Sequence, residues 1–282
     1  MNTNLVDFHK KHNVLVCVDS DGCAMDTMNV KHIECFGPKI IEVFGLEKIE
    51  DEFLRLWNEL NLYSMTRGIN RFKGLVLSFD VAYERGMNVT PFKALKTWTE
   101  ETPELSNRAL ELAYKQSGEE ELKLGLLWSE KVNEAIGNLS DVDKPFAGVK
   151  EGLQSISQEA DVAIVSSANT TAVLEEWTRH GLGEYVDVLL GQEAGSKAKC
   201  IHDLLGFNYR ENQVVMVGDA PGDLDAAKKN GVHFYPIIVG QEEMSWNRLK
   251  QEAFPRLLAG AFDANYQEML INEFHAALES ND

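Results

Sequence analysis

The chain has 282 residues, of which 44% are hydrophobic and 26% charged, a composition typical of a globular protein with a substantial core. Its formal net charge of −18 repels a phosphate backbone, so we expect no nucleic-acid partner. The longest apolar runs are about five residues, far short of the roughly 20 that cross a bilayer, so we expect no membrane partner either. The length predicts about two domains.

The cysteines and the first residues of the chain predict a cellular compartment. The four cysteines, at positions 17, 23, 35 and 200, form no CxxC pair and have no histidine pair at zinc-finger spacing. The segment 1–11 is polar and lacks the apolar stretch of a signal peptide. We therefore expect a cytoplasmic protein with reduced thiols and no zinc. The oligomeric state stays open.

The first half of the chain begins with one strand and continues with helices. A short apolar run predicts a strand over 14–18. Helical patterns follow, with a helix over 51–62 and threonine–proline pairs at 90–91 and 102–103 that predict two further helix starts. Because no strand–helix alternation interrupts them, we predict that residues 24–141 form one inserted helical domain.

The second half alternates strands with helices. The β-branched apolar runs that predict strands are 162–165, 186–190, 214–217 and 234–239. The helical segments between them are 171–180, 197–205 and 221–229. One helix between successive strands is the signature of a parallel sheet. The predicted fold class is α/β, with a Rossmann-like parallel sheet built by residues 1–23 and 142–282 and a helical domain inserted after its first strand.

Polar side chains follow four of the predicted strands. In chain order they are Asp19 and Asp21, then Ser166, Ser167 and Asn169, then Lys197, then Asp219 and Asp223. Because an open parallel sheet binds its ligands at the carboxyl ends of its strands, we expect these residues to lie close together. Four carboxylates would repel one another without a cation, and oxygen-only ligands favour Mg²⁺. Lys197 and Ser166 are then left to hold an anion beside the metal, which predicts a phosphoryl group.

The order and spacing of these residues resemble the haloacid dehalogenase superfamily, in its phosphatase and phosphomutase branch. The match consists of DxDG at 19–22, Ser166 at a strand end, Lys197 at a helix start and GDxxxD at 218–223. The inserted residues 24–141 stand where that family carries a mobile helical cap. The resemblance therefore implies a core of the haloacid dehalogenase type with an inserted helical cap.

The resemblance also implies an activity and a role for each residue. It implies a Mg²⁺-dependent phosphatase that hydrolyses a small phosphorylated metabolite through an aspartyl-phosphate. Asp19 would be the nucleophile, and Asp21 would protonate the leaving oxygen and then activate water. The implied phosphate-binding residues are Ser166, Ser167, Asn169 and Lys197. The implied metal-binding residues are Asp19, Asp21 through its backbone carbonyl, Asp219 and Asp223.

Each motif also has a plain structural explanation, and other functions share the motifs. DxDG is also compatible with a turn, and Ser166 with a helix cap. Lys197 is also compatible with a solvated lysine, with Lys199 as its competitor, although Ile201 four residues after Lys197 fits a helix facing the sheet. A phosphomutase shares all four motifs. A receiver-like phosphoswitch also uses an acidic Mg²⁺ pocket with a lysine, but it has no inserted domain of this length.

One basic segment of the inserted domain stands out in this acidic chain. Gly68 breaks the helical pattern within 64–73 and predicts a loop that presents Arg67, Asn70 and Arg71. We expect Arg67 or Arg71 to contact the substrate. The alternative is that these side chains are solvated or form salt bridges.

Overall fold

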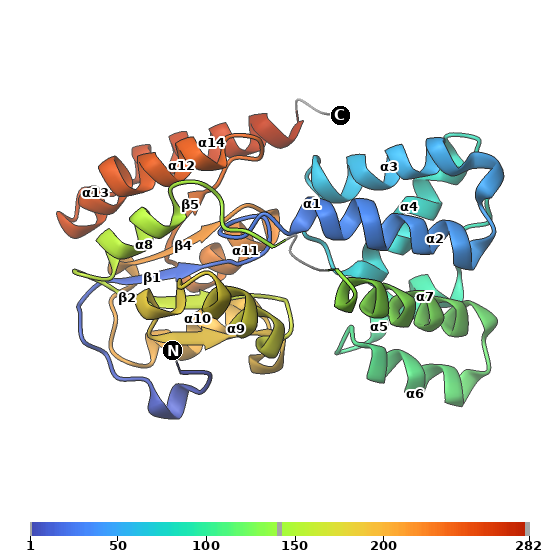
Figure 1. The fold of residues 1–282 in the computed structure, drawn as a ribbon, viewed down its shortest axis with the longest axis horizontal. Coiled ribbons are helices and arrows are strands. Elements are labelled where there is room, and N and C mark those ends of the chain that lie inside the picture. Colours follow the sequence, from blue (N-terminus) through green and yellow to red (C-terminus); the bar gives the residue numbers. More distant parts are fainter. Residues whose placement is uncertain (1, 140–142, 280–282) are drawn as a thin grey trace. The chain divides into compact units, whose positions relative to one another are not determined.

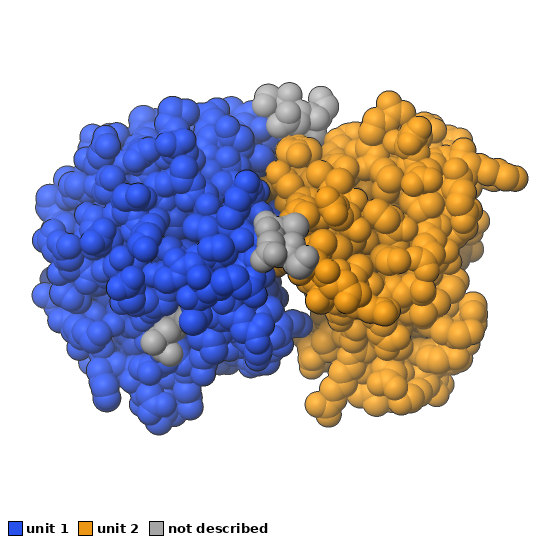
Figure 2. Space-filling view, viewed as in Figure 1, with its two compact units in different colours: residues 1–28, 143–280 blue, residues 29–142, 281–282 orange. Residues whose placement is uncertain are grey.

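The computed structural model describes residues 2–139 and 143–279, which divide into two compact units (Figure 2). One unit, called here the core unit, consists of the residues up to Met28 and those from Asp143 onward. The other, called the cap unit, begins at Asn29. The first predicted boundary was residue 23, and the second, at 141–142, lies outside the described residues. In the part of the chain that the structure describes, no helix is both long and apolar enough to span a membrane.

The core unit is built on one parallel sheet, which confirms the predicted α/β class (Figure 1). Its strands are β1 Leu15–Val18, β2 Asp161–Val165, β3 Val188–Leu190, β4 Val214–Gly218 and β5 His233–Pro236. They lie in the order β3-β2-β1-β4-β5. In the pairing of β1 with its two neighbours, Val18 lies opposite Ile164 and Val217. The three central strands therefore end at one level, which brings the residues after them together.

Helices cover both faces of this sheet. They are α8 Val149–Ile156, α9 Thr170–Arg179, α10 Lys197–Leu205, α11 Pro221–Asn230, α12 Glu242–Arg248, α13 Phe254–Leu258 and α14 Ala264–Glu279. Val16 and Val18 point to the face where α8, α9 and α12 contribute buried side chains to one apolar cluster. Cys17 points to the other face, close to Cys200 of α10. Burial on both faces explains why the strands are continuously apolar.

The cap unit is helical, as predicted. Its helices are α2 Gly37–Phe44, α3 Glu50–Leu62, α4 Arg71–Glu84, α5 Ala94–Glu101, α6 Asn107–Ser117 and α7 Glu120–Gly137, after the short α1 Met28–Val30 and a π-helical segment Lys31–Phe36. The helix predicted over 51–62 is confirmed as α3. Buried aromatic rings, among them Trp57, Trp128 and Phe53, form the centre of this unit.

The predicted helix start at 90–91 is wrong. The helix α5 begins at Ala94, and its first N–H groups are capped from another helix. The carboxylate of Glu121 accepts hydrogen bonds from the N–H groups of Ala94 at 2.7 Å and Leu95 at 3.2 Å. A cap supplied across the unit replaces the local threonine as the start signal.

The predicted start at 102–103 is wrong as well. The next helix, α6, begins at Asn107, because the hydroxyl of Ser106 accepts a hydrogen bond from the N–H of Ala109 at 3.2 Å. Thr102 instead stands at the C-terminal end of α5. Ser106, four residues after Thr102, therefore supplies the cap from which the helix begins.

Candidate active site

Three carboxylates converge at the carboxyl ends of β1 and β4. Asp19 directly follows β1, and Asp219 and Asp223 follow β4; one oxygen of each lies within 4.8 Å of the others. All three residues are at most 5% exposed. Asp223 stands in the first turn of α11, where its carboxylate accepts a hydrogen bond from the N–H of Ala220 at 3.1 Å. The strand order thus brings together residues that are about two hundred positions apart in the sequence.

Lys197 joins these carboxylates. Its Nζ lies 2.7 Å from Oδ2 of Asp19 and 2.5 Å from Oδ1 of Asp223. Lys197 is the first residue of α10, and its side chain is 13% exposed. The competing Lys199 is largely exposed and pairs with Asp203 on its own helix. The side chain of Ile201 is buried, as its spacing from Lys197 predicts.

The electrostatics of this cluster are those of a site short of positive charge. Burial raises the pKa of Asp19 well above its usual value, the nearby Asp223 and Asp219 raise it further, and Lys197 only partly offsets them. For Lys197, burial lowers the pKa, but Asp19 and Asp223 outweigh it and raise the pKa above its usual value. Lys197 is therefore protonated at neutral pH, and it contacts two of the three clustered carboxylates.

The donor set fits Mg²⁺. Oxygen ligands from a few buried carboxylates suit a small hard cation, which would also supply the missing positive charge. The backbone is adapted to this close approach, because a Cβ at Gly218 would lie only 2.3 Å from Cγ of Asp223. Glycine at position 218 allows the end of β4 and the first turn of α11 to approach so closely.

Asp21 lies in the turn after Asp19 and makes a different contact. Its carboxylate accepts a hydrogen bond from the hydroxyl of Thr27, a buried residue that no sequence motif marks. Its carboxylate is not one of the three that cluster. The prediction that its backbone carbonyl binds the metal stays a prediction.

The residues after β2 have contacts of their own. Ser166 is buried, and its Oγ accepts a hydrogen bond from the N–H of Ala168 at 3.1 Å. Ser167 is exposed. Asn169 caps α9, because its Oδ1 accepts hydrogen bonds from two N–H groups of the first turn, and its amide donates to Glu193. That these three residues bind phosphate stays a prediction.

Arg67 and Asn70 make hydrogen bonds within the cap unit, and whether they also contact the substrate stays a prediction. Arg67 is 3% exposed and donates a hydrogen bond to the carbonyl of Leu62 at 2.6 Å. Asn70 is the N-cap of α4 and accepts a hydrogen bond from the N–H of Phe72 at 3.0 Å. The predicted loop at Gly68 is present, with a positive φ of 70°.

Arg71 is held by neutral groups. Its guanidinium donates to Oγ of Ser129 at 3.0 Å and Oδ1 of Asn133 at 2.7 Å, and it lies 5.0 Å from the ring centre of Phe36. Burial lowers its pKa to about 10, so it stays charged at neutral pH. Its hydrogen-bond partners among the described residues are all neutral, and no described carboxylate contributes to its pKa shift. Whether Arg71 contacts the substrate stays a prediction.

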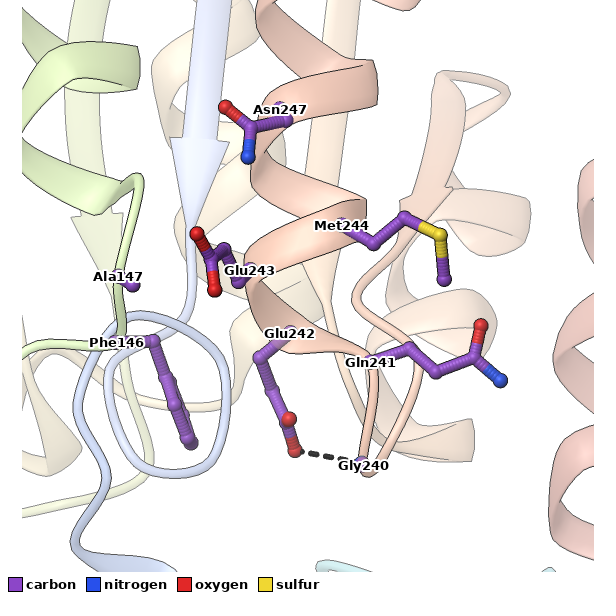
Figure 3. Close-up of a pocket in the computed structure, with 8 residues that line it drawn as sticks. All are labelled: Phe146, Ala147, Gly240, Gln241, Glu242, Glu243, Met244 and Asn247. Carbon is purple, nitrogen blue, oxygen red and sulfur yellow. Dashed lines mark hydrogen bonds between the residues drawn. The ribbon is translucent and has the colours of Figure 1, made fainter.

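A surface hollow of about 610 Å³ lies elsewhere on the core unit (Figure 3). It is lined by Phe146, Ala147, Asn247 and residues 240–244, with α12 on one side and the segment around Phe146 on the other. None of the clustered aspartates lines it. Size alone therefore does not identify the chemical site of this protein.

The parallel sheet interrupted by a helical unit, with buried aspartates and one lysine at its carboxyl edge, defines a hydrolase fold of the haloacid dehalogenase type. The sequence model of haloacid dehalogenase-like hydrolases matches residues 82–237, more than half of the chain. The chain belongs to this family. The matched stretch contains Ser166, Lys197, Asp219 and Asp223 and begins after Asp19, whose assignment therefore depends on the DxDG motif and the geometry.

Solved structures share the fold at low sequence identity. A predicted phosphoglycolate phosphatase from Lactobacillus delbrueckii is 14% identical, with a TM-score of 0.52 over 79% of this chain and 85% of that chain. A second one, from Haemophilus somnus, is 16% identical, with a TM-score of 0.50 over 79% of this chain and 84% of that chain. No curated protein sequence matches the chain. These similarities show the fold and leave the substrate open.

Proposed function

We propose that this chain is a Mg²⁺-dependent phosphatase that hydrolyses a small phosphorylated metabolite through an aspartyl-phosphate on Asp19. The observation that carries the proposal is the contact of Lys197 with both Asp19 and Asp223 in a buried cluster of three carboxylates. A lysine that stays protonated beside a carboxylate nucleophile reduces the repulsion between that carboxylate and an incoming phosphate dianion. We expect it to act in the cytoplasm, without nucleic acid or membrane as a partner.

In this mechanism Asp19 attacks phosphorus and Lys197 neutralises the transferring oxygens. The Ser20 N–H donates to Oδ1 of Asp19 at 2.8 Å, and Lys197 holds Oδ2, so the carboxylate is fixed at both oxygens. Lys197 can donate to a phosphoryl oxygen from the same place, because an ammonium has three donors. Ser166, Ser167 and Asn169 are proposed to complete the phosphate-binding site from the end of β2.

Asp21 is proposed to protonate the leaving oxygen and later to remove a proton from the attacking water. Its Oδ1 accepts a hydrogen bond from the Thr27 hydroxyl, which orients the carboxyl group beside Asp19. A positioned acid–base group typically contributes about 10²–10⁴-fold to the rate.

Asp19, Asp219, Asp223 and the backbone carbonyl of Asp21 are the residues proposed to hold Mg²⁺. When bound, the ion would supply positive charge next to the phosphoryl oxygens and lower the repulsion between the dianion and Asp19. Exhaustive chelation should therefore abolish phosphate release, and Mg²⁺ should restore it better than Ca²⁺, which tolerates larger coordination shells. Full activity after chelation would refute the metal assignment.

A panel of phosphorylated metabolites, including phosphoglycolate, tests the function as a whole. The expected result is repeated release of inorganic phosphate from at least one of them. Interconversion of sugar phosphates without net phosphate release would point to a phosphomutase instead. A single phosphorylation of Asp19 without sustained turnover would point to a phosphoswitch.

A further inference from the structure

The turn after Asp19 is tightly wound on one carbonyl. The carbonyl of Ser20 accepts hydrogen bonds from the N–H groups of Cys23, Ala24 and Met25 at 3.3, 2.9 and 2.8 Å. We call residues 20–25 the nucleophile turn. Its winding sets where Asp21 points, because Asp21 lies inside it.

Two buried indoles reach this turn from distant helices. Trp177 of α9 donates its ring N–H to the hydroxyl of Ser20 at 2.9 Å, and Trp246 of α12 donates its ring N–H to the carbonyl of Cys23 at 2.9 Å. Both tryptophans are fully buried. The nucleophile turn is therefore hydrogen-bonded to both indoles, at Ser20 and at Cys23. Both tryptophans belong to the apolar cluster that packs on one face of the sheet.

The place of Trp246 is shaped by missing side chains. A Cβ at Gly152 of α8 would lie 2.8 Å from Cε3 of Trp246, and one at Gly148 would lie 3.3 Å from its Cβ. The ring of Trp246 thus packs directly against Gly152, and its Cβ packs against Gly148. A buried ring held this closely can direct its N–H at one carbonyl with little freedom to turn away.

We propose that Trp177 and Trp246 are positioning residues that hold the nucleophile turn so that Asp21 can reach the leaving oxygen at Asp19. The proposal rests on the proposed phosphatase function. Its physical basis is that a displacement of about 1 Å in a catalytic group can cost roughly 10²-fold in rate. Packing alone would not require both indole N–H groups to end on this one turn.

The sharpest test removes only the ring N–H. Replacing Trp246 by β-(3-benzothienyl)alanine keeps the shape of the ring and deletes the donor to Cys23. We expect kcat on the best substrate to fall about tenfold with KM changed less than about twofold. Hydrogen exchange at the Cys23, Ala24 and Met25 amides should accelerate in the same variant.

Tyr235→Phe is the matched control. Tyr235 donates its hydroxyl to the carbonyl of Ser245, the residue just before Trp246, at 2.7 Å. Its loss also removes one buried hydrogen bond in the core unit but none that ends on the nucleophile turn. This variant should keep both kcat and the exchange rates of the turn.

The hydrogen bond between Trp177 and Ser20 is tested by a double-mutant cycle. Trp177→Phe and Ser20→Ala each remove one side of the same hydrogen bond, so their effects on kcat should be non-additive. Additive effects, or unchanged kcat and unchanged exchange in the Trp246 variant, would overturn the proposal. If the wild type releases no phosphate, the proposed function fails, and the exchange rates still decide whether the indoles hold the turn.

Discussion

Lys197 and Lys199 stand two residues apart on α10 and both pair with carboxylates, but they differ in burial. Lys197 is surrounded by buried carboxylates, whereas Lys199 pairs with Asp203 at the surface. We expect Lys197→Met to lower the free energy of unfolding by about 3–5 kcal/mol in the presence of a chelator, because it leaves buried carboxylates uncompensated. Lys199→Met should change it by less than about 0.5 kcal/mol. Urea unfolding of both variants measures the difference.

The activities of the two lysine variants provide a second readout. Lys197→Met should lose phosphate release, and Lys199→Met should keep it. Equal stability and equal activity of the two variants would contradict the assignment of Lys197 to the site.

Asp19→Asn should abolish turnover without unfolding the protein. An amide cannot act as the carboxylate nucleophile, so kcat should fall by at least about 10³-fold. The fold should persist because relief of repulsion from Asp219 and Asp223, which raise the pKa of Asp19, offsets the weaker contact with Lys197. Phosphate release and a thermal melt by circular dichroism are the measurements. Wild-type rates in purified variant would show that another residue is the nucleophile.

At the scale of residues, the strand-end residues of the site could be predicted from the sequence. The residues that hydrogen-bond to the turn after Asp19 could not. Asp19, Lys197 and Asp219 are predictable because parallel topology brings strand ends to one edge, whatever the intervening length. Trp246 is not, because its partner Cys23 is 223 positions away and a buried tryptophan looks like any other core residue. Thr27 is missed for a similar reason, since a lone threonine carries no pattern.

At the scale of elements, most of the helix starts described above follow local signals, whereas the start of α5 follows a tertiary one. The helix α10 begins at Lys197 as predicted, because Ser196 caps it locally. The helix α5 begins three residues later than 91 because Glu121 of α7 accepts its first N–H groups. A carboxylate that caps a helix from another helix leaves no pattern in the sequence around the start of the capped helix.

The contribution of the Glu121 cap to stability can be tested by comparing substitutions of Glu121 and of the adjacent Glu120. We expect Glu121→Ala to destabilise the protein by about 1–2 kcal/mol, because two N–H groups of α5 lose their acceptor. Glu120→Ala removes only an exposed pair with Lys123 and should be close to neutral. Thermal unfolding of both variants checks the contrast, and equal effects would mean that α5 does not depend on this cap.

At the scale of the whole molecule, the proposed function requires a chain of net charge −18 to bind an anionic phosphate ester. Local positive charge solves this problem, and in the core unit we propose that Lys197 and a bound Mg²⁺ together provide it. In the cap unit the basic segment contains two arginines with different settings. Arg67 is buried and bonded to the Leu62 carbonyl, whereas Arg71 has only neutral hydrogen-bond partners among the described residues. Arg71 therefore keeps a positive charge that no described carboxylate cancels.

We propose that Arg71 selects substrates and that Arg67 supports the structure of the cap unit. We expect Arg71→Met to lower kcat/KM for the best metabolite about tenfold, equivalent to some 1.4 kcal/mol, because a charged contact with the substrate is lost. Activity toward p-nitrophenyl phosphate, whose leaving group offers no polar body to bind, should fall less than about twofold.

Arg67→Met should behave differently. It removes the donor to a buried carbonyl, so thermal unfolding should shift downward, while the ratio of activities toward the two substrates stays at the wild-type value. If Arg71→Met also leaves that ratio unchanged, both arginines are structural. Substrate selectivity must then reside in other side chains. The charge of Arg71 would in that case be stabilised by its cation–π contact with the ring of Phe36.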